Sequence, residues 1–144
     1  MRVLAVSVLA AAAAAVAVFA APASASATSI VAFKSPSGSI HCIYSTAVGS
    51  ASRVRCDVDY DTRFRRRPAG CMGDYGRSFE VTSRGRGRAT CVTDSTNVPG
   101  ASVLRYGTSR RFGAITCTSR QTGLRCYNTR GHGFFLARNR QLVY

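Results

Sequence analysis

Six cysteines constrain this chain more than any other feature, because an even number of cysteines in a small exported protein predicts a disulfide framework. They are Cys42, Cys56, Cys71, Cys91, Cys117 and Cys126. A zinc site would need cysteines or histidines only a few positions apart, and no two of these cysteines are that close. The sequence therefore predicts three disulfides, with no metal and no other cofactor.

The first 27 residues predict an oxidising compartment, because they have the three parts of a signal peptide. Arg2 gives a positive start, and residues 3–21 are uncharged and apolar. Ala25-Ser26-Ala27 is the best A-x-A cleavage site, and Ala23-Ser24-Ala25 fits nearly as well. An uncleaved membrane anchor is the alternative, since the apolar run is long enough to span a bilayer. The proline and the small residues that follow the run favour cleavage. We expect residues 1–27 to be removed and residues 28–144 to form one secreted domain, free or associated with the cell envelope.

Short stretches of alternating apolar and polar residues, bounded by turn residues, predict an all-β domain. In residues 53–61, Val54, Cys56, Val58 and Tyr60 alternate with charged residues, as in a strand that is buried on one face. No segment keeps a helical period. We expect a small disulfide-stapled antiparallel sandwich or barrel. The predicted strands are 30–33, 39–44, 53–61, 78–82, 88–93, 102–106, 114–118, 124–127, 133–137 and 140–143.

A weak internal repeat indicates how the cysteines pair. The pattern G-x-I-x-C occurs at residues 38–42 and again at 113–117, and Val54-Arg55-Cys56 matches Leu124-Arg125-Cys126. Each cysteine follows an aliphatic residue by two positions, so both side chains lie on the same face of a strand. Many connectivities are open to six cysteines, and the repeat favours two stapled hairpins. The predicted pairs are Cys42–Cys56, Cys71–Cys91 and Cys117–Cys126.

The chain is strongly basic. Its formal charge of +14 becomes +13 when Arg2 leaves with the signal peptide, and every remaining cation except Lys34 is arginine. Arginine suits phosphate and carboxylate because its planar fork bonds two oxygens at once. A GC-rich genome would also raise the arginine content, so composition alone predicts only that polyanions are attracted.

Two arginine clusters are the candidate anion-binding residues. The first is Arg63, Arg65, Arg66 and Arg67, and the second is Arg84, Arg86 and Arg88. Arginines beside glycines and aromatic residues can contact phosphates and stack on bases. Clusters that share one face would form an anion-binding patch, and the alternative is two solvated loops.

His132 lies between two glycines and is a candidate for a ligand-binding loop, because glycines allow close approach and histidine can exchange protons. The alternative is a turn in which this histidine caps local carbonyl groups. An enzyme would need His132, His41 and Glu80 to converge in one cleft, and no spacing or nucleophile motif links them. We therefore predict no catalytic residue.

Four segments of the chain form distinctive motifs: Phe33–Cys42 (F-K-S-P-S-G-S-I-H-C), Val54–Asp57 (V-R-C-D), Cys71–Gly76 (C-M-G-D-Y-G) and Cys126–Arg138, which ends in G-H-G-F-F-L-A-R. In these segments the chain resembles a family of small exported actinobacterial proteins that is classed only as a domain of unknown function. The resemblance implies export and disulfides, and it implies no activity.

The sequence leaves the function unknown and allows three hypotheses. The first is an exported basic module that binds anionic polymers such as a cell-wall polymer, nucleic acid or an acidic glycan. The second is a structural or protein-interaction domain of the cell envelope, which should expose an apolar patch. The third, a small ribonuclease-like hydrolase, is disfavoured because its histidines and glutamate have no characteristic spacing.

The signal peptide gives the first testable prediction. Protein recovered outside the cytoplasm should begin near Thr28, because signal peptidase cuts after the A-x-A site. Intact-mass measurement of the secreted material checks this prediction. A mass that retains residues 1–27 would contradict it.

Overall fold

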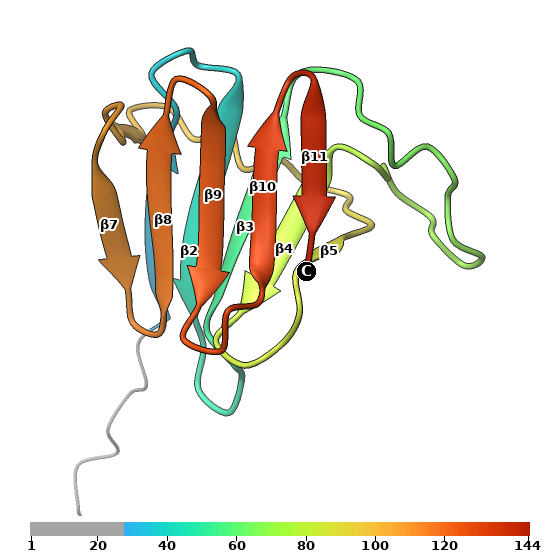
Figure 1. Ribbon diagram of the computed structural model, residues 1–144. Coiled ribbons are helices and arrows are strands. Elements are labelled where there is room, and N and C mark those ends of the chain that lie inside the picture. Colours follow the sequence, from blue (N-terminus) through green and yellow to red (C-terminus); the bar gives the residue numbers. More distant parts are fainter. Residues whose placement is uncertain (1–27) are drawn as a thin grey trace, which may run out of the picture.

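The fold is an all-β sandwich, which confirms the predicted class. The computed structural model describes residues 28–144, and the predicted signal peptide lies outside the described residues. Residues 28–144 form eleven strands and no helix, so they include no helical segment suited to crossing a membrane. A six-stranded sheet and a five-stranded sheet lie face to face (Figure 1). Both sheets are open, so the sandwich alternative is correct and no closed barrel forms.

Each sheet is built mainly from neighbouring antiparallel strands. The six-stranded sheet has the order β5-β4-β3-β2-β1-β6 and contains β1 Ser29–Lys34, β2 Ile40–Thr46, β3 Arg53–Val58, β4 Ser78–Thr82, β5 Arg88–Ala89 and β6 Ser102–Val103. The five-stranded sheet has the order β11-β10-β9-β8-β7 and contains β7 Ser109–Phe112, β8 Ile115–Arg120, β9 Gly123–Asn128, β10 Gly133–Ala137 and β11 Arg140–Val143. The pairing of β6 with β1 is parallel.

The strand predictions differ from the structure in two ways. Strand β7 was not predicted, because its segment Ser-Arg-Arg-Phe has only one buried residue, Phe112, and shows no alternation in sequence. Three strands are shorter than predicted. Strand β3 ends at Val58, β5 ends at Ala89 and β6 ends at Val103.

The internal repeat extends further in the structure than in the sequence. Five strands of each sheet follow the same order, so β1–β5 correspond to β7–β11. Cys56 pairs across strands with Phe79, and Cys126 pairs in the same way with Phe134. The domain is therefore two similar five-strand meanders that face each other, with β6 added to the first.

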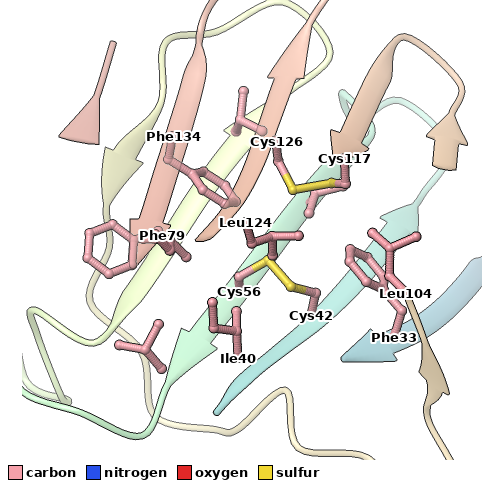
Figure 2. Packing of buried hydrophobic residues seen from close by; sticks show 14 of the residues in the cluster. Phe33, Ile40, Cys42, Cys56, Phe79, Leu104, Cys117, Leu124, Cys126 and Phe134 are labelled. Atoms are coloured by element: carbon pink, nitrogen blue, oxygen red, sulfur yellow. A yellow bond between two sulfur atoms is a disulfide. The ribbon is translucent and has the colours of Figure 1, made fainter. Parts of the chain in front are cut away.

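The core lies between the two meanders and is lined by matching residues. Figure 2 shows the disulfides Cys42–Cys56 and Cys117–Cys126 among buried apolar side chains, and all four cysteines are fully buried. Aromatic rings contact each other across the core: Phe33 stacks on Phe112 at 5.0 Å, and Phe79 meets Phe134 at 6.4 Å between centroids. Burial of each such ring contributes about 1.5–3 kcal/mol, so side-chain packing joins the sheets.

The three disulfides follow the predicted sequential pairing. Cys42–Cys56 and Cys117–Cys126 each join directly opposed residues of a hairpin, with Cα atoms 4.1 Å apart. Cys71–Cys91 lies outside the core and joins the β3–β4 connection to the segment after β5. Three disulfides in so small a domain are typical of an oxidising, extracellular environment.

The difference in burial predicts an order of reduction. Mild reductant under native conditions should open Cys71–Cys91 first, because Cys91 is exposed whereas the other two disulfides are inaccessible to solvent. Alkylation of free thiols followed by peptide mass mapping measures this order. Replacing both Cys71 and Cys91 with alanine should lower the free energy of unfolding by about 3 kcal/mol, the chain-entropy value for a loop of this length.

Equal rates of alkylation at all six cysteines would contradict the predicted order.

Candidate functional site

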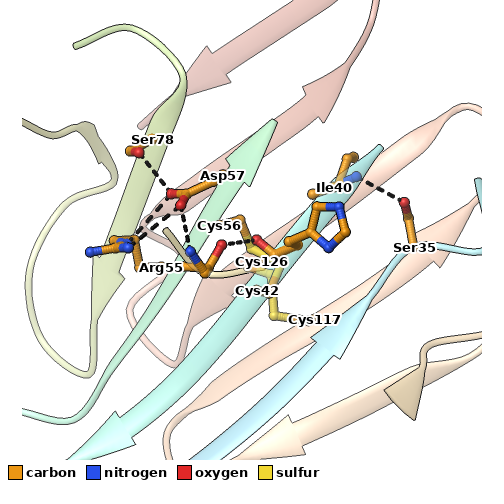
Figure 3. The surroundings of a disulfide bond; sticks show 11 residues. Ser35, Ile40, Cys42, Arg55, Cys56, Asp57, Ser78, Cys117 and Cys126 are labelled. Atoms are coloured by element: carbon orange, nitrogen blue, oxygen red, sulfur yellow. Dashed lines mark hydrogen bonds and ion pairs between the residues drawn. A yellow bond between two sulfur atoms is a disulfide. The ribbon is translucent and has the colours of Figure 1, made fainter. Parts of the chain in front are cut away.

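The outer face of the six-stranded sheet is occupied by an ion-pair network. Asp57 on β3 accepts hydrogen bonds from the Ser78 hydroxyl and the Thr96 backbone N–H, both at 2.7 Å, and pairs with Arg55 (Figure 3). Arg55 in turn donates to Asp94 at 2.7 Å. These bonds hold the segment 94–96 over the sheet, so Asp57 and Arg55 have a structural role.

The other carboxylates of the described chain are also mostly neutralised by arginine. Glu80 on β4 is only 5% exposed and lies between Arg88 at 2.7 Å and Arg53 at 3.5 Å. Asp61 accepts a hydrogen bond from Arg77 at 2.6 Å, and this bond lowers the pKa of the Asp61 carboxyl below its ordinary value. None of these carboxylates is placed as a free acid or base.

The first arginine cluster lies in the long connection between β3 and β4. In Figure 1 this connection extends outward beyond the edge strand β11. The Arg63 backbone N–H donates to the buried Gln141 side chain of β11 at 3.1 Å, which fixes the loop against the beginning of that strand. Arg65, Arg66 and Arg67 are exposed.

The second arginine cluster lies at the opposite end of β4. The Gly87 backbone N–H donates to the Tyr144 carbonyl at 2.9 Å, which places this loop beside the end of β11. The buried Asn128 side chain also donates to the Gly85 carbonyl at 2.8 Å. The two clusters are thus separate from each other, but both border the β11 edge of the sandwich.

His132, His41 and Glu80 lie on different parts of the fold. His132 is in the β9–β10 turn of the five-stranded sheet, where its backbone N–H donates to the Asn128 side chain at 3.1 Å. His41 and Glu80 lie on β2 and β4 of the other sheet, separated by β3. The structure does not bring these three side chains into one cleft.

The five-stranded sheet and its neighbouring segments carry no acidic residue. Residues 95–144 contain eight arginines, and the last acidic residue of the chain is Asp94. On the outer face of this sheet, the Arg125 guanidinium lies 4.8 Å from the centre of the Tyr127 ring and 5.6 Å from that of Tyr144. The Arg125 Nε also donates to the Tyr144 hydroxyl at 2.8 Å. Sequence reasoning missed this group, although the absence of acidic residues after Asp94 was a visible signal.

A cleft of about 500 Å³ opens between the sheets, at the end where the β8–β9 and β10–β11 turns lie. Its lining includes the ring of Tyr60, whose buried hydroxyl has no hydrogen-bond partner in the described part of the chain. The Arg138 guanidinium lies 5.0 Å from the centre of that ring. Burial raises the pKa of Tyr60 to about 12, against a smaller lowering effect of Arg138.

Within residues 28–144, no group of three or more His, Cys, Asp or Glu side chains is arranged to hold a metal ion.

These features define a small disulfide-stapled β-sandwich with one acid-free sheet. The chain belongs to a family of unknown function, DUF6636, whose family model matches residues 7–144. No curated protein and no solved structure matches the chain. The family relationship therefore supplies no activity, and a function has to be argued from the surface.

The buried Tyr60 hydroxyl leads to a prediction on alkaline stability. The pKa of Tyr60 is about 12 in the folded protein and 10.0 in the unfolded chain, so the folded state favours the neutral phenol. The resulting contribution to stability is complete below pH 10 and is lost as the pH rises toward 12. Tyr60→Phe should reduce this loss, and near neutral pH it should leave stability unchanged or raise it by about 1 kcal/mol, because an unpaired buried hydroxyl is removed.

Urea unfolding as a function of pH measures both effects. Tyr106→Phe is the matched control, since Tyr106 is 41% exposed. Destabilisation of Tyr60→Phe at neutral pH would show that the hydroxyl has a stabilising partner.

Proposed function

We propose that this protein is exported and that it binds anionic polymers along the β11 edge of the sandwich, where the two arginine clusters border the acid-free sheet. The supporting observation is the segregation of charge along the chain. All six acidic residues lie between Asp57 and Asp94, whereas residues 95–144 hold eight arginines and no acidic residue. A surface with one sign of charge raises the local concentration of oppositely charged ligands and speeds their association.

The position of the arginine clusters also supports this proposal. The first cluster borders the beginning of β11, and the second borders the end of the same strand. An extended polymer lying along the β11 edge would therefore meet arginine at both ends. Only Arg88 of the second cluster is engaged with a carboxylate, that of Glu80.

The distribution of the carboxylates indicates that the charge pattern results from selection and not from codon bias alone. A GC-rich genome would raise arginine throughout the chain, but it would not remove aspartate and glutamate from one half alone. In residues 28–94, four of the ten arginines pair with carboxylates, as in the pairs Arg55–Asp94 and Arg77–Asp61. In the second half Arg138 has such a partner, Asp59, at 3.8 Å.

The salt dependence of binding tests this function. Affinity for polyphosphate should fall steeply with salt, because each neutralised phosphate contributes about −0.7 to −0.9 to the slope of log affinity against log salt. Replacing Arg65, Arg66 and Arg67 with glutamine should flatten that slope by about 2, measured by fluorescence anisotropy over a salt series.

A matched control separates the β11 edge from general basicity. Replacing Arg105, Arg110 and Arg111 with glutamine removes the same charge from exposed positions near the opposite edge, where β6 and β7 lie. Equal flattening by both triple variants would mean that binding follows net charge alone. Absence of salt-dependent binding in the unmodified protein would reject the proposed function.

A further inference from the structure

We infer that the outer face of the five-stranded sheet is a stacking surface for single-stranded nucleic acid. This inference rests on the proposed function and assigns its ligand class and its site. We call the site the aromatic–arginine face, and it consists of Arg120, Arg125, Tyr127, Phe135, Arg140 and Tyr144.

The two halves of the internal repeat differ on their outer faces in a way that points to a ligand. In the first sheet, the positions beside the matched cysteine and phenylalanine hold Arg55, Asp57 and Glu80; in the second they hold Arg125, Tyr127 and Phe135. The arginine is retained, but both carboxylates are replaced by aromatic rings. The second face is therefore cationic and aromatic where the first is neutralised.

The two outer faces also differ in what covers them. Segment 94–96 lies over the first sheet, where the Thr96 hydroxyl donates to the His41 carbonyl and its backbone N–H donates to Asp57. The second sheet faces the viewer in Figure 1, and no segment of residues 28–144 crosses in front of it. Its partly exposed rings are thus available to a ligand from solvent.

The cross-strand register gathers the flat groups into adjacent rows. Arg125, Phe135 and Leu142 lie directly opposite one another on β9, β10 and β11. The neighbouring row contains Tyr127 and Gly133, and the Tyr144 backbone N–H donates to the Gly133 carbonyl at 2.9 Å. Neighbouring strands are about 4.8 Å apart, so Phe135 on β10 lies one strand away from Tyr127 on β9 and from Tyr144, which follows β11.

Glycine keeps the middle of the second row open. A Cβ atom on Gly133 would lie 2.1 Å from the Cys126 carbonyl oxygen and 2.9 Å from the Tyr127 Cβ, so no side chain fits there. The space between Tyr127 and Tyr144 is left to the Arg125 guanidinium, which contacts both rings. An exposed guanidinium plane held by two rings is itself a surface on which a base can stack.

Shallow hollows lie on both sides of Phe135, and each has arginine at its border. One, of about 450 Å³, is lined by Arg120, Arg125 and Tyr127 among others. The other, of about 280 Å³, is lined by Arg125, Arg140 and Tyr144 among others. Each hollow thus offers an aromatic ring on which a planar ligand group can stack and an arginine that can bind an anionic group beside it.

The chemistry of this face favours nucleic acid over an acidic glycan. Sugars carry many hydroxyl donors, and carboxylate oxygens accept hydrogen bonds from them more strongly than Ser, Thr or Tyr hydroxyl oxygens do. The outward-facing strand side chains here are Arg, Thr, Ser, Tyr, Phe and Leu, with no Asp, Glu, Asn or Gln among them. Nucleic acid needs only aromatic rings on which its bases can stack and hydrogen-bond donors for its phosphate oxygens. The aromatic–arginine face provides both.

The first experiment uses the unmodified mature protein and needs no variant. Fluorescence anisotropy at one salt concentration compares a thymidine oligonucleotide, an abasic oligonucleotide of equal length, polyphosphate and polygalacturonate. The thymidine oligonucleotide should bind about tenfold or more tightly than the abasic one, because base stacking on aromatic side chains contributes affinity that phosphate contacts cannot.

The second experiment locates the stacking surface. Phe135→Leu and Tyr127→Leu keep the charge and an apolar side chain, and each should weaken thymidine oligonucleotide binding about tenfold while leaving polyphosphate binding unchanged. Tyr106→Leu is the control, since this exposed tyrosine lies outside the face on the connection between β6 and β7. Circular dichroism and disulfide mapping verify that each variant is folded.

The outcomes separate this inference from the proposed function. Equal binding of the thymidine and abasic oligonucleotides would overturn the stacking surface and leave polyanion binding intact. Tighter binding of polygalacturonate would overturn it in favour of a glycan ligand. Failure of every polyanion to bind would overturn both the inference and the proposed function.

Discussion

The structure depends on one constraint, which is that each central hairpin places its two cysteines directly opposite each other and toward the core. Cys42 opposes Cys56, and Cys117 opposes Cys126. A slip of one residue in either hairpin would separate the sulfur atoms and turn every side chain of the strand to the other face. The disulfides therefore determine which residues of these strands face the core. For the same reason, they determine that Arg125 faces solvent.

Much of this framework could be predicted from the sequence, because the signals are local. Cysteine and aliphatic residues two positions apart show which face of a strand is buried, and turn residues separate the strands. Both β4 and β10 were predicted as strands, but their equivalence within the repeat was not predictable in this way. A long loop separates Cys56 from Phe79, whereas a short turn separates Cys126 from Phe134, so the equivalence of the two phenylalanines becomes visible only in the paired strands.

The candidate site was less predictable than the fold, since it is assembled across strands. Dense arginine runs such as Arg63–Arg67 stand out in a sequence. Arg125 on β9, Phe135 on β10 and Tyr144 just after β11 each stand alone in the sequence and look like ordinary surface residues. Only the cross-strand register places them together, and only the fold shows that one sheet is covered by a segment of chain while the other is not.

The repeat explains why the two outer faces could become so different. The inner faces must fit each other, so both halves retain the same sequence of aliphatic, cysteine and aromatic residues. The outer faces have no such requirement. In the first half, Arg55 and Asp57 hold the segment that leads on toward β6, so that face has a structural role. The second half carries no comparable connection within residues 28–144, and its outer side chains are therefore free of that structural role. The second outer face does not hold another segment of the described chain in place and carries aromatic rings where the first carries carboxylates. Such a surface can bind a ligand without disturbing the contacts that hold the chain together.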